Sequence, residues 1–146
     1  MGKGEVLEEL LREICFLVKK VGRQVLRNYE LTPAQFEVLQ KLYFLGKMKM
    51  SDLSRELGVA KSTITGIVKG LEHAGYVTRE KDTNDLRVNV LDLTTKGREV
   101  IEKVIMRRQN FVSQCSQSIG EKISGRLEND LKQFLESIRR EAKNWL

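Results

Sequence analysis

The stretch MSDLSRELGVAKSTITGIVKGLEHAGYV, residues 50–77, decides the fold that this 146-residue chain is expected to adopt. Ser51 is expected to cap a short helix, and Gly58 supplies the tight turn that follows it. A second helix is predicted over residues 61–74, and Gly75 ends it. Two short helices joined by a glycine turn are typical of DNA-reading units, because the second helix can lie in a major groove.

The predicted second helix has one apolar face and one polar face. Its apolar side carries Ile64, Ile67, Val68 and Leu71. The candidate contacts to DNA base edges and phosphates are Ser51, Lys61, Ser62, Thr63, Thr65 and Lys69. Hydroxyls, ammonium groups and helix-start amides are suitable donors for that task. The solvated face of an ordinary core helix would show the same pattern, so the spacing alone leaves both interpretations open.

A β-hairpin is predicted directly after the second helix. Its strands cover residues 76–81 and 88–93, and the polar segment that joins them carries a single arginine, Arg87, among aspartates. The next helix begins in LTTKG, residues 93–97, with Thr94 as its cap. A helix-turn-helix followed by such a hairpin is a winged helix, and this order of elements strengthens the DNA-binding interpretation.

Amphipathic helices are predicted on both sides of this module. Apolar residues recur at three- and four-residue spacing over residues 5–27 and again beyond the hairpin, with a break near Gly120. In LTPAQ, residues 31–35, a further helix begins with Thr32 as its cap, and Gln35 reaches back to complete a capping box. The fold class is therefore mainly α with a small β-hairpin wing.

One domain is expected over residues 1–146, because the length suits a single core. Within it, residues 31–96 form the winged helix-turn-helix part, and residues 1–30 and 97–146 form a helical dimerisation part. The apolar faces of the terminal helices are longer than the winged module needs for its own core. Surplus apolar stripes of this kind indicate a partner helix, which a second copy of the chain would supply.

Three segments of the chain together resemble the MarR family of bacterial and archaeal transcription regulators. They are LTPAQFEVLQKL (31–42), LSRELGVAKSTITGIVKGLEHAGYVTRE (53–80) and DLRVNVLDLTTKG (85–97). The resemblance implies a homodimer with intertwined terminal helices, in which each subunit offers one winged helix-turn-helix to double-stranded DNA. It also implies that Arg87 enters a minor groove, that Asp85 orients it, and that residues 61–69 belong to the recognition helix.

The chain departs from the family pattern at a few positions that concern DNA recognition. Leu86 stands where many members have an arginine, and Ala60 stands at a helix start where serine or threonine is common. Gly66 lies on the exposed face, where longer polar residues are frequent, and Gly70 adds a second glycine to the same helix. These departures bear on the target sequence and the affinity rather than on the family.

The resemblance also suggests a regulatory input, since members are typically released from DNA by a small molecule, by oxidation or by a metal. Phe16 and Tyr43 are candidate contacts to a small-molecule effector, although core packing is the simpler explanation for both. Cys15 is a candidate redox residue in the first helix. The simpler interpretation is that Cys15 and Cys115 are small buried hydrophobic residues.

The composition is consistent with a nucleic-acid partner and argues against other classes. There are 26 basic and 20 acidic residues, which leaves a net charge of +6 and favours a polyanionic partner. With two distant cysteines and a single histidine, His73, neither a metal site nor another cofactor is expected. No apolar run approaches the roughly 18 residues that span a bilayer, so no membrane partner and a cytoplasmic location are expected.

The sequence thus predicts a transcription regulator, expected to be a repressor, that binds a pseudo-palindromic operator as a homodimer and is released by a small-molecule effector. One alternative is a redox-sensing regulator that uses Cys15. Another is a winged-helix module that binds proteins and not DNA. An enzyme is not expected, because no nucleophile–base pair, phosphate loop or carboxylate dyad is evident.

Overall fold

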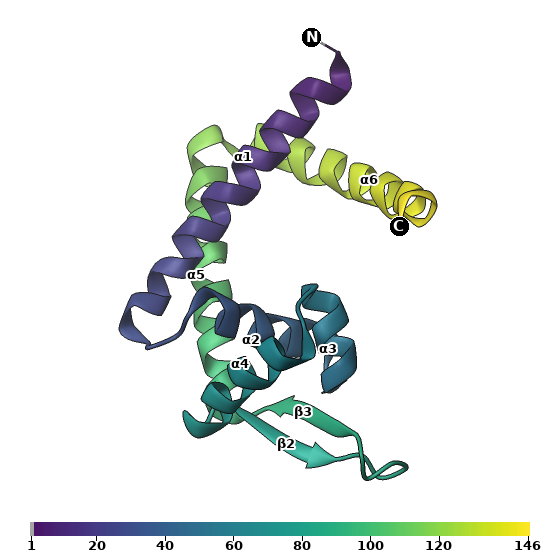
Figure 1. The fold of residues 1–146 in the computed structure, drawn as a ribbon. Coiled ribbons are helices and arrows are strands. Elements are labelled where there is room, and N and C mark those ends of the chain that lie inside the picture. The colour runs from purple at the N-terminus through teal and green to yellow at the C-terminus, as the bar shows by residue number, and fades with distance from the viewer. Residues whose placement is uncertain (1) are drawn as a thin grey trace. The chain divides into compact units, whose positions relative to one another are not determined.

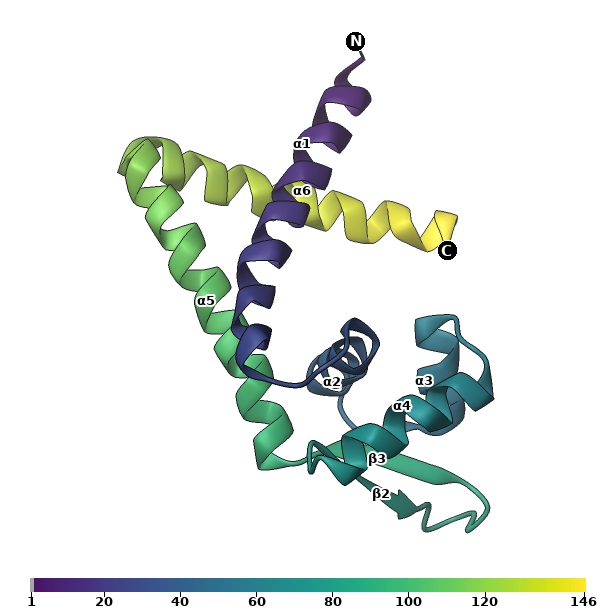
Figure 2. The ribbon, with the colours of Figure 1, turned by 60° about the vertical axis from the view of Figure 1, so that its left-hand side comes forward.

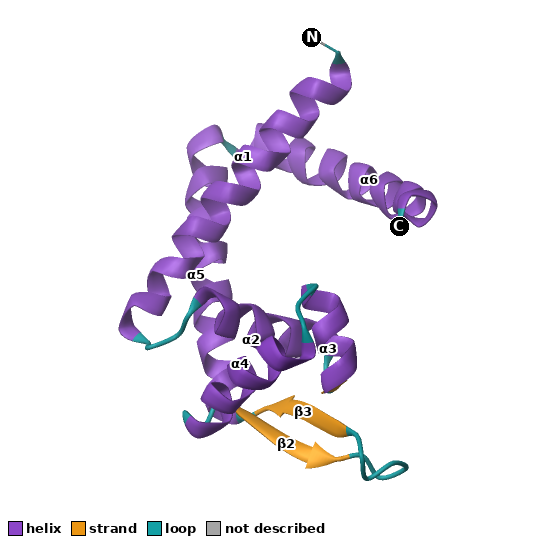
Figure 3. Ribbon diagram, viewed as in Figure 1, coloured by secondary structure: helices purple, strands orange, loops and turns teal. Residues whose placement is uncertain are grey.

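The computed structural model describes residues 2–146, which form mostly helices and one small antiparallel sheet (Figure 1, Figure 3). They divide into two compact units, one that reaches Arg107 and one that runs Arg108–Leu146. The predicted fold class, mainly α with a β-hairpin wing, is confirmed.

The elements of the first unit are helices and the three strands of the sheet. They are α1 (Lys3–Arg23), the 3₁₀ helix η1 (Gln24–Asn28), α2 (Pro33–Leu45), β1 (Met48–Lys49), α3 (Met50–Leu57), α4 (Lys61–His73), β2 (Val77–Lys81), β3 (Asn89–Leu93) and the first half of α5 (Thr95–Ile119). The sheet order is β1-β3-β2, and both pairings are antiparallel. Figure 2 shows α3 and α4 beside this sheet, with the long loop between β2 and β3 at its end.

Local chemistry explains where α2 begins and ends. The Thr32 hydroxyl accepts a hydrogen bond from the Gln35 amide at 3.1 Å, and the Gln35 side chain accepts one from the Thr32 amide at 3.0 Å. This reciprocal pair is the predicted capping box. At the other end the chain adopts a φ of 82° at Gly46, a conformation that a side chain would disfavour, so the helix stops there.

The prediction that Ser51 caps α3 is wrong. Lys49 occupies the cap position, and the helix begins at Met50, so Ser51 lies inside the first turn. The cause is the short strand before it: Met48 pairs with Leu91 and Lys49 with Val90, and the chain passes from the sheet directly into the helix.

One hydrophobic core joins α2, α3, α4, the sheet and the start of α5. Its fully buried side chains are Phe36, Val38, Leu39, Leu42, Leu53, Ile64, Val68, Leu71, Leu91, Val100, Ile101 and Val104. Every buried residue of α4 comes from its predicted apolar face. The core therefore fixes which side of α4 remains exposed.

The end of α1 is attached to α5 by polar contacts. Arg107 donates hydrogen bonds to the Val21 carbonyl at 3.0 Å and to the Gln24 side chain at 2.7 Å. Lys103 donates one to the Tyr29 hydroxyl at 3.0 Å. The segment predicted as one helix over residues 5–27 is an α-helix, α1, that continues into the 3₁₀ helix η1.

The second unit consists of the rest of α5 and of α6 (Glu121–Trp145). The two helices meet at Gly120, where φ is 87°, so the predicted break is confirmed. The hydroxyls of Ser116 and Ser124 are hydrogen-bonded across this turn. No residue of α6 is buried, and most of its large apolar residues lie exposed along the helix.

Candidate nucleic-acid interface

The turn between α3 and α4 is fixed by a backbone conformation and a side-chain hydrogen bond. Gly58 adopts a left-handed conformation with φ of 64°. Ser54 is buried, and its hydroxyl donates to the Val59 carbonyl at 2.5 Å, while the Val59 amide donates to the Ser54 carbonyl at 3.1 Å. A larger side chain than serine at this position would separate the two helices.

The predicted contacts to DNA are all exposed. Exposed side chains are found at Ser51, Lys61, Ser62, Thr63, Thr65 and Lys69. The start of α4 is open as well, because Ala60 at the cap position offers no side-chain acceptor to the first amides. A helix start of this kind presents backbone donors and a positive dipole end to an anion.

The far end of α4 is held by the LTTKG segment. The Thr94 hydroxyl donates to the Gly75 carbonyl at 2.6 Å and accepts from the Gly97 amide at 3.1 Å, so the predicted cap of α5 is confirmed. Lys96 donates to the Ala74 carbonyl at 2.7 Å, and its ammonium lies 4.5 Å from the centre of the Tyr76 ring. A cation at the end of α4 also complements the helix dipole. The contribution of Lys96 was not predicted from the sequence.

A half-buried ion pair connects α4 to the wing. Arg79 in β2 donates to the Glu72 carboxylate of α4 at 2.5 Å, and both side chains are less than one third exposed. This pair was not predicted, because in the sequence Glu72 and Arg79 look like ordinary surface charges. Its effect is to fix the first wing strand against the recognition helix.

The loop between β2 and β3 presents Arg87 in an oriented position. The Arg87 side chain is 90% exposed, and its Nε and Nη2 atoms each donate to a different oxygen of Asp85 at 3.1 Å. The Arg87 amide also donates to Asp85, at 3.0 Å. The side-chain and then the backbone hydrogen bonds from Arg87 lower the pKa of Asp85, so the carboxylate stays charged. The predicted contact between the two residues is present.

Leu86, beside Arg87, is 72% exposed. The loop around it is closed by backbone hydrogen bonds from the Val88 amide to the Asp85 carbonyl, at 3.0 Å, and from the Asp82 amide to the Val88 carbonyl, at 2.8 Å. The tip of the wing therefore carries a leucine and an arginine next to each other in the chain, on a loop closed by hydrogen bonds.

The helix propensity of α4 is weakened by a glycine that its packing does not require. A Cβ atom built at Gly66 meets nothing within 4 Å. We therefore expect Gly66→Ala to stabilise the protein by about 1 kcal/mol, which raises the melting temperature by roughly 2–4 °C. Thermal unfolding followed by circular dichroism measures the shift. A lower melting temperature would mean that the space beside Gly66 is filled in solution.

The structure corrects the interpretation of the cysteines. Both Cys15 and Cys115 are exposed, so the prediction that they are buried hydrophobic residues is wrong for the single chain. An amphipathic pattern shows that a helix has an apolar side, but it does not show which chain covers it. Phe16 is likewise 62% exposed, with the Lys20 ammonium 5.8 Å from its ring centre, so core packing is wrong for Phe16 too.

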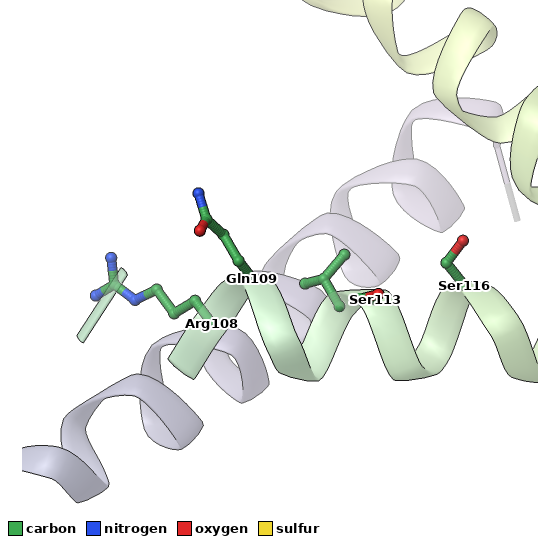
Figure 4. A pocket seen from close by; sticks show the side chains of 5 residues that line it. Arg108, Gln109, Ser113 and Ser116 are labelled. Carbon is green, nitrogen blue, oxygen red and sulfur yellow. The ribbon is translucent and has the colours of Figure 1, made fainter. Parts of the chain in front are cut away.

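Tyr43 packs against the core, and the Arg98 guanidinium lies 5.5 Å from its ring centre. Two surface hollows are present elsewhere, and neither includes Phe16 or Tyr43. The larger, of about 440 Å³, is lined by Arg108, Gln109, Val112, Ser113 and Ser116. All five side chains come from α5 (Figure 4), so this hollow is a depression along one helix.

Among residues 2–146, no three histidine, cysteine or acidic side chains are grouped so that they could bind a metal ion. Within the same residues no helix is both long enough and apolar enough to cross a bilayer.

A helix-turn-helix with an open recognition helix, followed by a hairpin that presents an arginine, defines a winged helix-turn-helix DNA-binding protein. The MarR family model matches residues 31–88. YsmB of Bacillus subtilis, an uncharacterized HTH-type transcriptional regulator, is 33% identical over 134 residues, 92% of each chain. The chain belongs to the MarR family, and it is a DNA-binding transcription regulator rather than an enzyme.

Two further relatives are similar to this chain. The crystal structure of the transcriptional regulator Tm0710 from Thermotoga maritima superimposes with a TM-score of 0.89 at 48% identity, and it covers 95% of this chain and 98% of that one. The transcriptional repressor MdtR of Bacillus subtilis is 28% identical over 112 residues, 75% of this chain and 72% of MdtR.

Proposed function

We propose that this regulator represses transcription as a homodimer, with α4 of each subunit in a major groove and Arg87 in the adjacent minor groove of a pseudo-palindromic operator. The observation that carries the proposal is the wing tip, where Asp85 holds an almost fully exposed guanidinium by two hydrogen bonds. A narrow minor groove attracts such a cation because its negative potential is enhanced. Ser51, Lys61, Ser62, Thr63, Thr65 and Lys69 would contact base edges and phosphates.

Exposed apolar stripes support the homodimer. In α6 they include Ile123, Leu127, Leu131, Leu135 and Ile138, and in α1 they include Val6, Leu7, Leu10, Ile14 and Leu17. Their spacing of three and four residues places each set on one side of its helix. Residues 1–30 and 97–146 would thus form the dimerisation part, and residues 31–96 the DNA-binding part. A two-fold dimer would set the two recognition helices roughly 34–36 Å apart, one turn of DNA.

Repression is supported by the relative MdtR, which is a named repressor. We include release by a small-molecule effector in the proposal, with Phe16 and Tyr43 as candidate contacts, because the exposed Phe16 ring offers an apolar surface. One observation favours the redox alternative: the Cys15 thiol is exposed, and a thiol must be reachable to be oxidised. Peroxide titration of operator binding by the parent protein and by Cys15→Ser separates these two inputs.

Replacing Arg87 tests the wing assignment. We expect Arg87→Ala to weaken operator binding by on the order of tenfold, with the loss concentrated at an A·T-rich flank, while the oligomeric state is unchanged. Asp85→Asn should weaken binding less, since it removes the charge that orients the guanidinium but keeps the guanidinium itself. Fluorescence anisotropy with a duplex selected by the protein measures both affinities.

The matched control for this experiment is Arg12→Ala. Arg12 is also an exposed arginine that donates to a carboxylate, that of Glu8, so its removal changes the net charge equally. If Arg87→Ala leaves the operator affinity unchanged, or if Arg12→Ala lowers it as much, the wing is not part of the DNA interface. Binding should also weaken steeply with salt. If the protein binds no duplex at all, a protein-interaction module becomes the better explanation.

A further inference from the structure

Thr65 has an exposed side chain on the recognition helix, yet its hydroxyl is already engaged. The Oγ1 atom donates to the Lys61 carbonyl one turn earlier, at 2.8 Å. Threonine makes this bond to the backbone of its own helix readily, because the carbonyl of the residue four positions before it is within reach. The hydroxyl proton is therefore used inside the helix, and the γ-methyl group is the part of the side chain that remains for a partner.

The surroundings of Thr65 allow a close approach. Gly66 follows it, and a Cβ atom there would meet nothing within 4 Å, so no side chain stands between the backbone and a facing surface. Ser62, one turn earlier, is also small and exposed. Lys61 and Lys69, four residues to each side, are exposed long cations on the same side of the helix. This surface thus has small, partly apolar side chains at its centre. On either side of them lies a lysine ammonium that can bind a phosphate.

We infer that the Thr65 methyl group reads the 5-methyl group of a thymine in each half-site of the operator. The thymine methyl is the one apolar group on the major-groove edges of the bases, whereas adenine, guanine and cytosine offer polar atoms there. A side chain whose donor is used within the helix gains most from that apolar contact. This inference rests on the proposed function, because it needs α4 to lie in a major groove.

An alternative is that the Thr65 hydroxyl, and not its methyl group, contacts a base. The Thr65 oxygen can still accept a hydrogen bond, so it could face an adenine or cytosine amino group instead. In that case the hydroxyl would matter and the methyl would not. Valine keeps the methyl group and the shape of threonine but lacks the hydroxyl, and serine keeps the hydroxyl but lacks the methyl. The pair Thr65→Val and Thr65→Ser separates the two readings.

The experiment uses the whole 146-residue chain and the duplex that it enriches from a random DNA library. Each thymine of the half-sites is replaced in turn by deoxyuridine, which removes only the 5-methyl group, and the dissociation constant is measured each time. At one symmetric position we expect the wild-type protein to bind about fivefold more weakly for the lost apolar contact. Thr65→Val should keep both the affinity and this sensitivity, while Thr65→Ser should bind the thymine duplex weakly and be insensitive to deoxyuridine.

Thr78→Ser is the matched control, because Thr78 is an exposed threonine of β2 that lies outside the proposed DNA contacts. It should leave the response at the Thr65 position unchanged. The inference is overturned if the wild-type protein binds equally tightly with deoxyuridine at every position. It is also overturned if Thr65→Ser still binds the deoxyuridine duplex more weakly than the thymine duplex. Loss of binding in Thr65→Val, with normal binding in Thr65→Ser, overturns it in favour of the hydroxyl. If no duplex is enriched, the proposed function itself fails.

Discussion

Replacing Gly97 with alanine should lower the free energy of unfolding by about 3 kcal/mol and the melting temperature by roughly 10 °C. A Cβ atom at Gly97 would lie 2.3 Å from the carbonyl oxygen of Tyr76 and 3.1 Å from a methyl group of Leu93. No pair of non-bonded atoms of this kind approaches so closely, so either α5 or the strand entry must move. The substitution therefore disturbs the contact between the start of α5 and the segment that follows the recognition helix α4.

The Tyr76 carbonyl cannot yield easily, because it is held from both sides. It accepts a hydrogen bond from the Thr94 amide at 3.1 Å, and the Tyr76 amide donates to the Leu71 carbonyl at 2.9 Å. The Tyr76 side chain is buried as well. Overpacking costs more where the neighbouring atoms are backbone atoms with such bonds than where a side chain can rotate away.

Gly66→Ala is the matched control, since it adds the same methyl group to a helix of the same module, at a position with open space. Urea and thermal unfolding of the two variants should shift in opposite directions. A Gly97→Ala variant as stable as the parent would show that the start of α5 moves away at little cost.

The parts of the fold that the sequence predicted well depend on local chemistry. The capping box at Thr32 and Gln35 and the left-handed turn at Gly58 each involve residues a few positions apart. The pair of Asp85 and Arg87 is equally local, because only one residue stands between them. Turn and cap preferences act at this range, so a single sequence contains them.

The parts that the sequence did not predict depend on residues brought together by the fold. Lys96 reaches the Ala74 carbonyl across 22 positions, and Arg79 meets Glu72 only because β2 turns back along α4. Nothing in the local pattern distinguishes these side chains from other surface charges. The exposure of Phe16 was not predicted for a related reason. Helical periodicity shows that a helix has an apolar face, but it does not show which chain covers that face.

Placing two lysines in the apolar stripe of α6 should convert the proposed homodimer to a monomer and lower operator affinity at least a hundredfold. Leu131 and Leu135 are successive members of that stripe and are exposed in the single chain. If a partner helix covers them, each contributes roughly 1.5–3 kcal/mol by burial, and a buried ammonium without a partner opposes association further. A monomer binds one half-site only. It therefore lacks the additional affinity that a dimer gains by binding two half-sites at once.

The control variant carries two lysines on the same helix at Asn129 and Gln133, away from the leucine stripe. Both double variants add two positive charges, which by themselves favour DNA, so weaker binding by Leu131→Lys/Leu135→Lys alone must come from lost association. Sedimentation equilibrium measures the oligomeric state, and anisotropy with the selected duplex measures the affinity. A leucine variant that remains dimeric would place the subunit contact elsewhere than on this face of α6. If it instead becomes monomeric but binds with unchanged affinity, one winged module suffices for recognition, and the two-half-site operator would have to be abandoned.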